Sequence, residues 1–121
     1  MRTVNAAQIL EWEHQGKLVI CIDIRERQSH QYLPVHGGFK IPFNKVKYNS
    51  TLLIPYREYI TVIFGMNAAN RCNRVHIAEQ ALYAMGFVQV YGLEEGLMEG
   101  WIKPTQRKKH LPGPTNQSTA F

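Results

Sequence analysis

The residues best suited to chemistry lie between positions 65 and 74, where a cysteine stands among arginines. Cys72 is flanked by Arg71 and Arg74, and positive neighbours favour the thiolate form, which is the form that acts as a nucleophile. The alternative is that Cys72 is a small side chain packing against the first turn of a helix. The candidate anion-binding residues of this segment are Gly65, Met66, Asn67, Ala68, Ala69, Asn70, Arg71, Asn73 and Arg74.

A second candidate group follows the apolar run that ends at Asp23. Asp23 is the only aspartate in the chain, and we expect it, with Arg25, to orient neighbouring loops through hydrogen bonds. Cys21 lies inside the apolar run, which favours core packing over chemistry. The five histidines form no i, i+4 pair and no cluster with cysteine, so we expect no metal site and no cofactor.

Helices and strands alternate along the chain, and this alternation must position the candidate residues. Apolar runs over 18–23 and 60–64 are typical of strands buried on both faces. Gly and Pro separate these runs from the other elements. The remaining expected elements are strands over 39–41 and 88–91, helices over 5–15, 72–85 and 95–101, a short helix over 26–32, and a loop with one helical turn over 43–56.

Short buried strands separated by helices predict parallel pairing and an open α/β sheet covered on both faces. In such sheets, ligands bind beyond the carboxyl ends of the strands. The residues at that edge would be Asp23, Arg25, the 65–74 segment and the segment after Tyr91.

The charge of the chain divides into two parts. The 121 residues carry 14 basic and 9 acidic side chains, a formal charge of +5. Four of the basic residues, and none of the acidic ones, lie in residues 103–121, which also contain three prolines. This composition predicts a basic, flexible tail after a nearly neutral domain over 1–102.

Five segments, in order along residues 3–102, resemble motifs of the rhodanese-like domain family. They are Val4–Leu10 with Ile22-Asp-Ile-Arg-Glu26, Gly37-Gly-Phe-Lys-Ile-Pro42, Asn73-Arg74, Ala84-Met-Gly-Phe87, and Val90-Tyr91 followed by Glu95-Gly96 and Trp101. The resemblance implies an open, mainly parallel five-stranded sheet with helices on both faces. It also implies sulfur transfer through a persulfide on a cysteine, held by backbone amides between the fourth strand and a helix.

The position of the family's cysteine is not occupied by cysteine here. Counted back from Phe87 with a short loop, that position is Ala69; counted forward from Phe64 with a long loop, it is Gly65. The long-loop count needs no extra residues after the strand, and it keeps the Cys-x5-Arg spacing of phosphatase and arsenate-reductase relatives at Arg71. Neither residue is a nucleophile, which argues against phosphoryl transfer.

Two functions remain open. The first is a sulfurtransferase that takes sulfur from thiosulfate or a persulfide donor onto Cys72 and passes it to an acceptor. The alternative is an inactive rhodanese-homology module that binds a protein or an anionic ligand through the 65–74 loop. The four tail charges are only a modest signal for nucleic acid, and a solvated tail explains them equally well.

Composition also bears on location. No apolar run approaches the roughly 18 residues of a membrane-spanning helix, and no apolar segment of signal-peptide type follows Met1. Two cysteines cannot form a disulfide scaffold, which favours a reducing compartment. We therefore expect a cytoplasmic protein without membrane contact.

Overall fold

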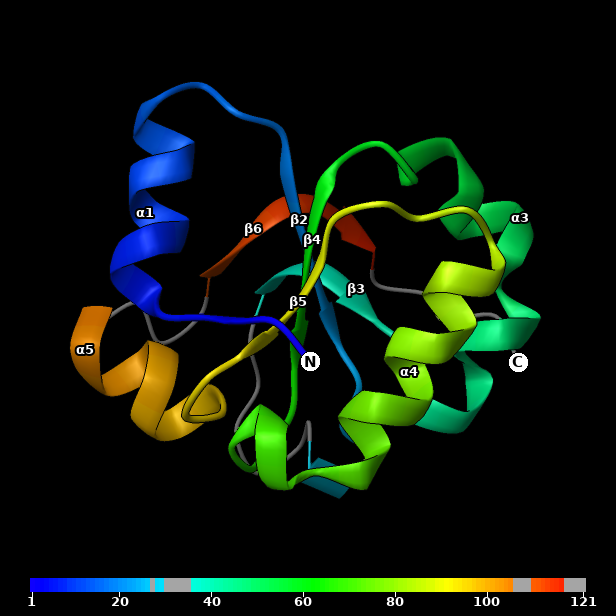
Figure 1. Ribbon diagram of the computed structural model, residues 1–121. Helices are drawn as coiled ribbons and strands as arrows, with labels where there is room; N and C mark the ends of the chain where they lie inside the picture. Colours follow the sequence, from blue (N-terminus) through cyan, green and yellow to red (C-terminus); the bar gives the residue numbers. More distant parts are fainter. Residues whose placement is uncertain (27, 30–35, 106–109, 117–121) are drawn as a thin grey trace.

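The computed structural model describes residues 1–26, 28–29, 36–105 and 110–116. In this part of the chain, six strands form one sheet in the order β1-β5-β4-β2-β3-β6, and every neighbouring pair is parallel (Figure 1). The strands are β1 Thr3–Val4, β2 Val19–Asp23, β3 His36–Lys40, β4 Ile60–Phe64, β5 Val90–Leu93 and β6 His110–Asn116. The helices are α1 Ala6–His14, α3 Ser50–Leu53, α4 Asn73–Ala84 and α5 Lys103–Thr105, with short helical turns η1 Phe43–Tyr48, η2 Ile54–Tyr56, η3 Ala69–Arg71 and η4 Met98–Ile102.

The two central strands divide their side chains between two cores. Because side chains alternate along a strand, Cys21 and Val62 face one core while Ile22 and Ile63 face the other. Trp101 packs in the first core, with its ring centroid 5.6 Å from that of Phe64. Helices α1 and α5 lie on one side of the sheet and α3 and α4 on the other (Figure 1). The continuous apolar runs therefore indicated correctly an α/β sheet covered on both faces.

The boundaries of the two long helices follow their caps. The Asn5 side chain accepts a hydrogen bond of 2.9 Å from the amide of Gln8 at the start of α1. After α4, Gly86 takes a left-handed φ of 93°, and the amide of Phe87 donates back to the carbonyl of Leu82. Both helices were expected within one or two residues of these bounds.

Other elements differ from expectation. Residues 43–56 form three short helical segments rather than a loop with one turn, and they bury Val46 and Leu53 completely. The last strand begins at Val90, not at Val88, which lies outside the sheet and is 62% exposed. The helix expected from Glu95 begins at Met98, because Gly96 has a φ of 82° that a right-handed helix excludes. The expected helix over 26–32 falls largely outside the described residues.

The sheet gains a strand from the segment predicted as a tail. Five strands were expected, and β6 is an additional strand that pairs with β3 at the edge of the sheet. Helix α5 also lies beyond residue 102, where the tail was predicted to begin. An edge position suits Pro112 and Pro114, because proline has no amide hydrogen to donate to a second neighbour. In the described residues, no helix combines the length and apolar character needed to cross a membrane.

The two thiols occupy different environments, and this predicts different reactivity. Cys21 is fully buried, and burial raises the pKa of its thiol well above the usual range, with the Glu13 and Asp23 carboxylates raising it further. Cys72 is only partly buried. We expect iodoacetamide to modify Cys72 in the native protein and Cys21 only after unfolding, as measured by peptide mass spectrometry. Equal labelling of both thiols in the native state would contradict the buried position of Cys21.

Candidate functional site

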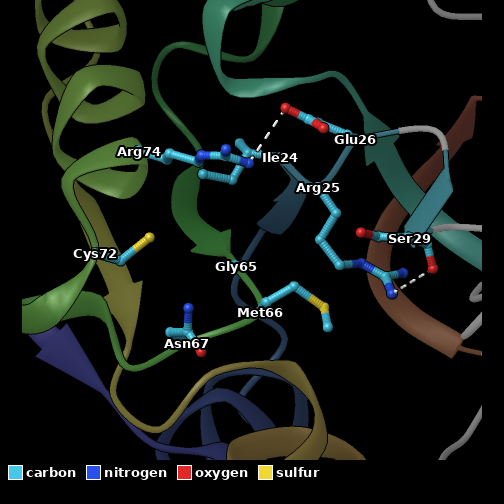
Figure 2. Close-up of a pocket in the computed structure, with 9 residues that line it drawn as sticks. All are labelled: Ile24, Arg25, Glu26, Ser29, Gly65, Met66, Asn67, Cys72 and Arg74. Atoms are coloured by element: carbon cyan, nitrogen blue, oxygen red, sulfur yellow. Dashed lines mark hydrogen bonds and ion pairs between the residues drawn. The ribbon is translucent and has the colours of Figure 1, made fainter.

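A cavity of about 380 Å³ lies beyond the carboxyl ends of β2 and β4, where sequence analysis placed the ligand site. Its walls come from the segment after β2, the loop after β4 and the start of α4 (Figure 2). The lining residues are Ile24, Arg25, Glu26, Ser29, Gly65, Met66, Asn67, Cys72 and Arg74.

The loop between β4 and α4 is fixed by the chain that follows β5. The amide of Leu97 donates to the carbonyl of Gly65 at 2.9 Å, and the amide of Ala69 donates to the carbonyl of Glu94 at 3.3 Å. Two hydrogen bonds thus hold the loop at its first and fifth residues. The cavity wall is an anchored segment rather than a free connection.

Two glycines allow the chain that follows β5 to approach the 65–72 loop this closely. A Cβ atom on Gly96 would lie 2.5 Å from the carbonyl oxygen of Met66. A Cβ atom on Gly92 would collide with the side chain of Ala69. Glycine at both positions is therefore a steric requirement for the shape of the 65–72 loop.

Cys72 is the N-cap residue of α4 and keeps an extended backbone, with φ −122° and ψ 104°. Its Sγ atom lies 3.9 Å from the point where a Cβ atom on Gly65 would stand. In Figure 2 this sulfur points from the start of α4 toward the other lining residues. The side chain makes no capping hydrogen bond to the helix. Cys72 thus presents its thiol to the cavity, beside the end of β4.

Arg25 lines the cavity across from Cys72 (Figure 2) and forms a buried ion pair with Asp23. Arg25 Nε donates to Asp23 Oδ1 at 2.9 Å, and Arg25 Nη2 donates to Asp23 Oδ2 at 2.8 Å. The two side chains are 1% and 0% exposed. The Asp23 carboxylate also accepts from the amide of Arg25, and Arg25 Nη1 donates to the carbonyl of Ser29 at 3.2 Å. The pair therefore fixes the path of the chain after β2.

Arg74 stands at the exposed side of the cavity. Its Nη1 atom lies 3.3 Å from Glu26 Oε1, and its guanidinium lies over the Phe43 ring, 4.9 Å from the centroid. Both charged side chains of this pair are about half exposed. Arg74 is thus held by a carboxylate and an aromatic face while remaining accessible to a ligand.

The predicted anion-binding residues divide between two hollows. Gly65, Met66, Asn67 and Arg74 line the cavity described above, whereas Ala69, Asn70, Arg71 and Asn73 line a neighbouring hollow of about 430 Å³. Cys72 borders both, and the half-buried Ala68 lies in the loop between them. Arg71 and Arg74, both predicted to bind an anion in one loop, line different hollows.

Sequence reasoning missed several residues that shape the cavity. Glu26 belongs to the Asp-Ile-Arg-Glu segment, so its position after a buried strand was the signal that could have identified it. Phe43 and Ser29 carried no such signal, because only the folded chain brings them to Arg74 and Arg25. Among the described residues, no three His, Cys, Asp or Glu side chains gather as metal ligands would.

Comparison with solved structures identifies the fold as rhodanese-like. A rhodanese-related protein from Thermoplasma volcanium has a TM-score of 0.65 at 20% identity, covering 87% of this chain and 94% of its own. A rhodanese with anions from E. coli has a TM-score of 0.54 at 25% identity, covering 67% and 89%. A human single-domain sulfurtransferase has a TM-score of 0.62 at 16% identity, covering 85% and 96%. No protein-family model matches the sequence, and no curated protein matches it.

The buried ion pair predicts a large stability effect. Replacing Asp23→Asn leaves the Arg25 guanidinium buried without its counterion, which we expect to lower the free energy of unfolding by about 3–5 kcal/mol. Urea denaturation measures the change. Glu99→Gln is the matched control, since it breaks the exposed Lys103–Glu99 pair and should cost less than about 1 kcal/mol. Similar losses of unfolding free energy in the two variants would contradict the expectation that breaking the buried pair costs more than breaking the exposed one.

Proposed function

We propose that this rhodanese-like domain transfers sulfane sulfur through a persulfide on Cys72. One observation carries the proposal: the Cys72 Sγ atom lies 3.9 Å from the position of a Cβ atom on Gly65. Of the two positions that the family resemblance gives for the reactive cysteine, Ala69 and Gly65, only Gly65 directly follows β4, and we take it as that position. The thiol that is missing from the end of β4 is therefore supplied to the same cavity by the start of α4.

The space beside Cys72 suits a second sulfur atom. Gly65 has no side chain, and the two sulfurs of a persulfide are about 2.05 Å apart. A sulfur atom added to Cys72 can therefore extend into the cavity that Cys72 and Gly65 both line. The positive end of α4 lies at Cys72 and stabilises negative charge within its first turn.

The transfer has two steps. The Cys72 thiolate attacks the outer sulfur of a donor, a new S–S bond forms, and the bond between that sulfur and the donor breaks. With thiosulfate the leaving group is sulfite, which departs with the bonding electron pair and leaves a Cys72 persulfide. An acceptor thiolate then attacks the outer sulfur, and Cys72 leaves as the thiolate. Each step exchanges one S–S bond for another, so no external oxidant or reductant is required.

The names of the similar structures add support. One is described as a rhodanese with anions and another as a single-domain sulfurtransferase. The absence of cysteine at Gly65 favours the other candidate function, a module that binds an anionic ligand or a protein in this cavity without turnover. Removal of the Cys72 thiol separates the two functions, because binding alone does not require a nucleophile.

Cys72→Ser should abolish sulfur transfer from thiosulfate to a thiol acceptor. Because a hydroxyl is a far weaker nucleophile than a thiolate, we expect a fall in kcat/KM of at least about a hundredfold, measured as sulfite release. Cys21→Ala removes the buried thiol and is the control. Its kcat/KM per folded molecule should equal that of the wild type. Unchanged sulfite release in Cys72→Ser, or none in the wild-type protein, would contradict the proposed route.

A thiol restored at the strand end provides a complementary test. In Gly65→Cys combined with Cys72→Ser, the new Cβ atom would lie 3.1 Å from Val75 Cγ2, a contact that a small shift of that side chain relieves. We expect partial recovery of sulfite release, because both thiols face the same cavity. If the wild type released sulfite but the double variant did not, a thiol at residue 65 could not replace Cys72. The transfer would then require the sulfur at the start of α4.

A further inference from the structure

The charged groups around the cavity form two pairs of opposite sign. Arg25 pairs with Asp23, and Arg74 pairs with Glu26. Arg25, Arg74 and Glu26 line the cavity, and Asp23 lies directly behind Arg25. Among the described residues, the wall therefore carries no net positive charge once each guanidinium is counted with its carboxylate.

The inner pair has little to offer a ligand. Arg25 directs three of its nitrogen atoms toward Asp23 and the carbonyl of Ser29. A ligand that captured this guanidinium would leave the Asp23 carboxylate buried and uncompensated, which is strongly unfavourable. Recognition of a charged ligand is thus left to the outer pair.

The outer pair is built differently. Arg74 and Glu26 are 55% and 49% exposed, and they share a single contact of 3.3 Å. Exposed pairs of this kind contribute little to stability, so a ligand can replace the contact at small cost. Arg74 would keep its place when Glu26 moves away, because the Phe43 ring supports the guanidinium.

Two classes of sulfur donor would meet this pair in opposite ways. A small dianion such as thiosulfate is attracted by Arg74 and repelled by Glu26. A zwitterion with adjacent carboxylate and ammonium groups can place the carboxylate beside Arg74 and the ammonium group beside Glu26. The two groups replace one protein ion pair by two protein–ligand contacts, so no charge at the outer wall is left uncompensated.

We infer that the donor is a zwitterionic persulfide of the amino-acid type, with its carboxylate on Arg74 and its ammonium group on Glu26. Cysteine persulfide is the simplest such molecule. The inference rests on the proposed function, since the persulfide end of the ligand is directed at Cys72. The cavity of about 380 Å³ is at the small end of the range for ligand pockets, which suits a molecule of this size.

The sulfur transfer remains balanced with this donor. The Cys72 thiolate attacks the outer sulfur of R–S–SH, and the Cys72 S–S bond forms as the bond within the donor breaks. The proton stays on the outer sulfur, which becomes the terminal atom of the Cys72 persulfide. Cysteine leaves as its thiolate, so the total charge is unchanged and no co-reactant is needed.

The test compares two donors that differ in one charged group. Cysteine persulfide has the ammonium group, whereas in N-acetylcysteine persulfide that group is blocked; thiosulfate serves as a third donor. The rate of persulfide formation on Cys72 is followed by intact mass, as a gain of about 32 Da, in the wild type, Glu26→Gln and Glu58→Gln. Glu58→Gln is the matched control, because Glu58 is exposed and precedes β4 at the opposite end of that strand.

We expect the ratio of the cysteine persulfide rate to the N-acetylcysteine persulfide rate to fall about fivefold in Glu26→Gln, the effect of losing one exposed ion pair. The ratio should be unchanged in Glu58→Gln, and the thiosulfate rate should rise in Glu26→Gln. A ratio that Glu26→Gln does not alter would overturn this inference and leave the proposed function standing. Failure of all three donors to label Cys72 would overturn both.

Discussion

The buried Asp23–Arg25 ion pair is the constraint on which the cavity depends. Asp23 is the last residue of β2, and its carboxylate holds both the backbone amide and the side chain of Arg25. The backbone around the pair is tied to both neighbouring strands, since the amide of Ile24 donates to the carbonyl of Phe64 and the amide of Ile41 donates to the carbonyl of Asp23. The cavity wall is therefore continuous with the hydrogen bonding of the central sheet, and a change in the pair would be transmitted to β2, β3 and β4 together.

The other side of the cavity is held by close backbone packing rather than by charge. Gly92 and Gly96 let the segment from β5 to η4 lie against the 65–72 loop, and two backbone hydrogen bonds fix the loop there. This packing positions the start of α4, and with it the thiol of Cys72. The proposed sulfur transfer requires the Cys72 sulfur to be held near the end of β4, and a loop anchored at Gly65 and Ala69 meets this condition without further ordering.

Much of the fold followed from apolar patterning, because β2 and β4 are buried on both faces and are apolar apart from Asp23 and Thr61. The helices α1 and α4 followed from Asn5 and Gly86, whose capping roles are local. The turns over 43–56 could not be predicted, since tertiary burial of Val46 and Leu53 determines them. The edge strand β6 was also missed, because the proline-rich composition of its segment indicates a tail and pairing with β3 is a long-range event.

In the site, too, some features could be predicted from the sequence and others depend on long-range contacts. The edge of the sheet and the candidacy of Asp23, Arg25 and Cys72 could be inferred from order along the chain, whereas the ion pair between Asp23 and Arg25 required the structure. The separation of Arg71 from Arg74 and the support of Arg74 by Phe43 required the folded geometry. Sequence spacing gives the number of residues between side chains, but it does not show that Cys72 borders both hollows.

A crystal structure of the protein after incubation with a sulfane-sulfur donor would show whether Cys72 carries sulfur in this cavity. We predict a second sulfur atom bonded to Cys72 Sγ, visible in the anomalous signal and directed toward Gly65. An unmodified Cys72, or a modified Cys72 whose added sulfur points into the hollow lined by Arg71, would contradict it.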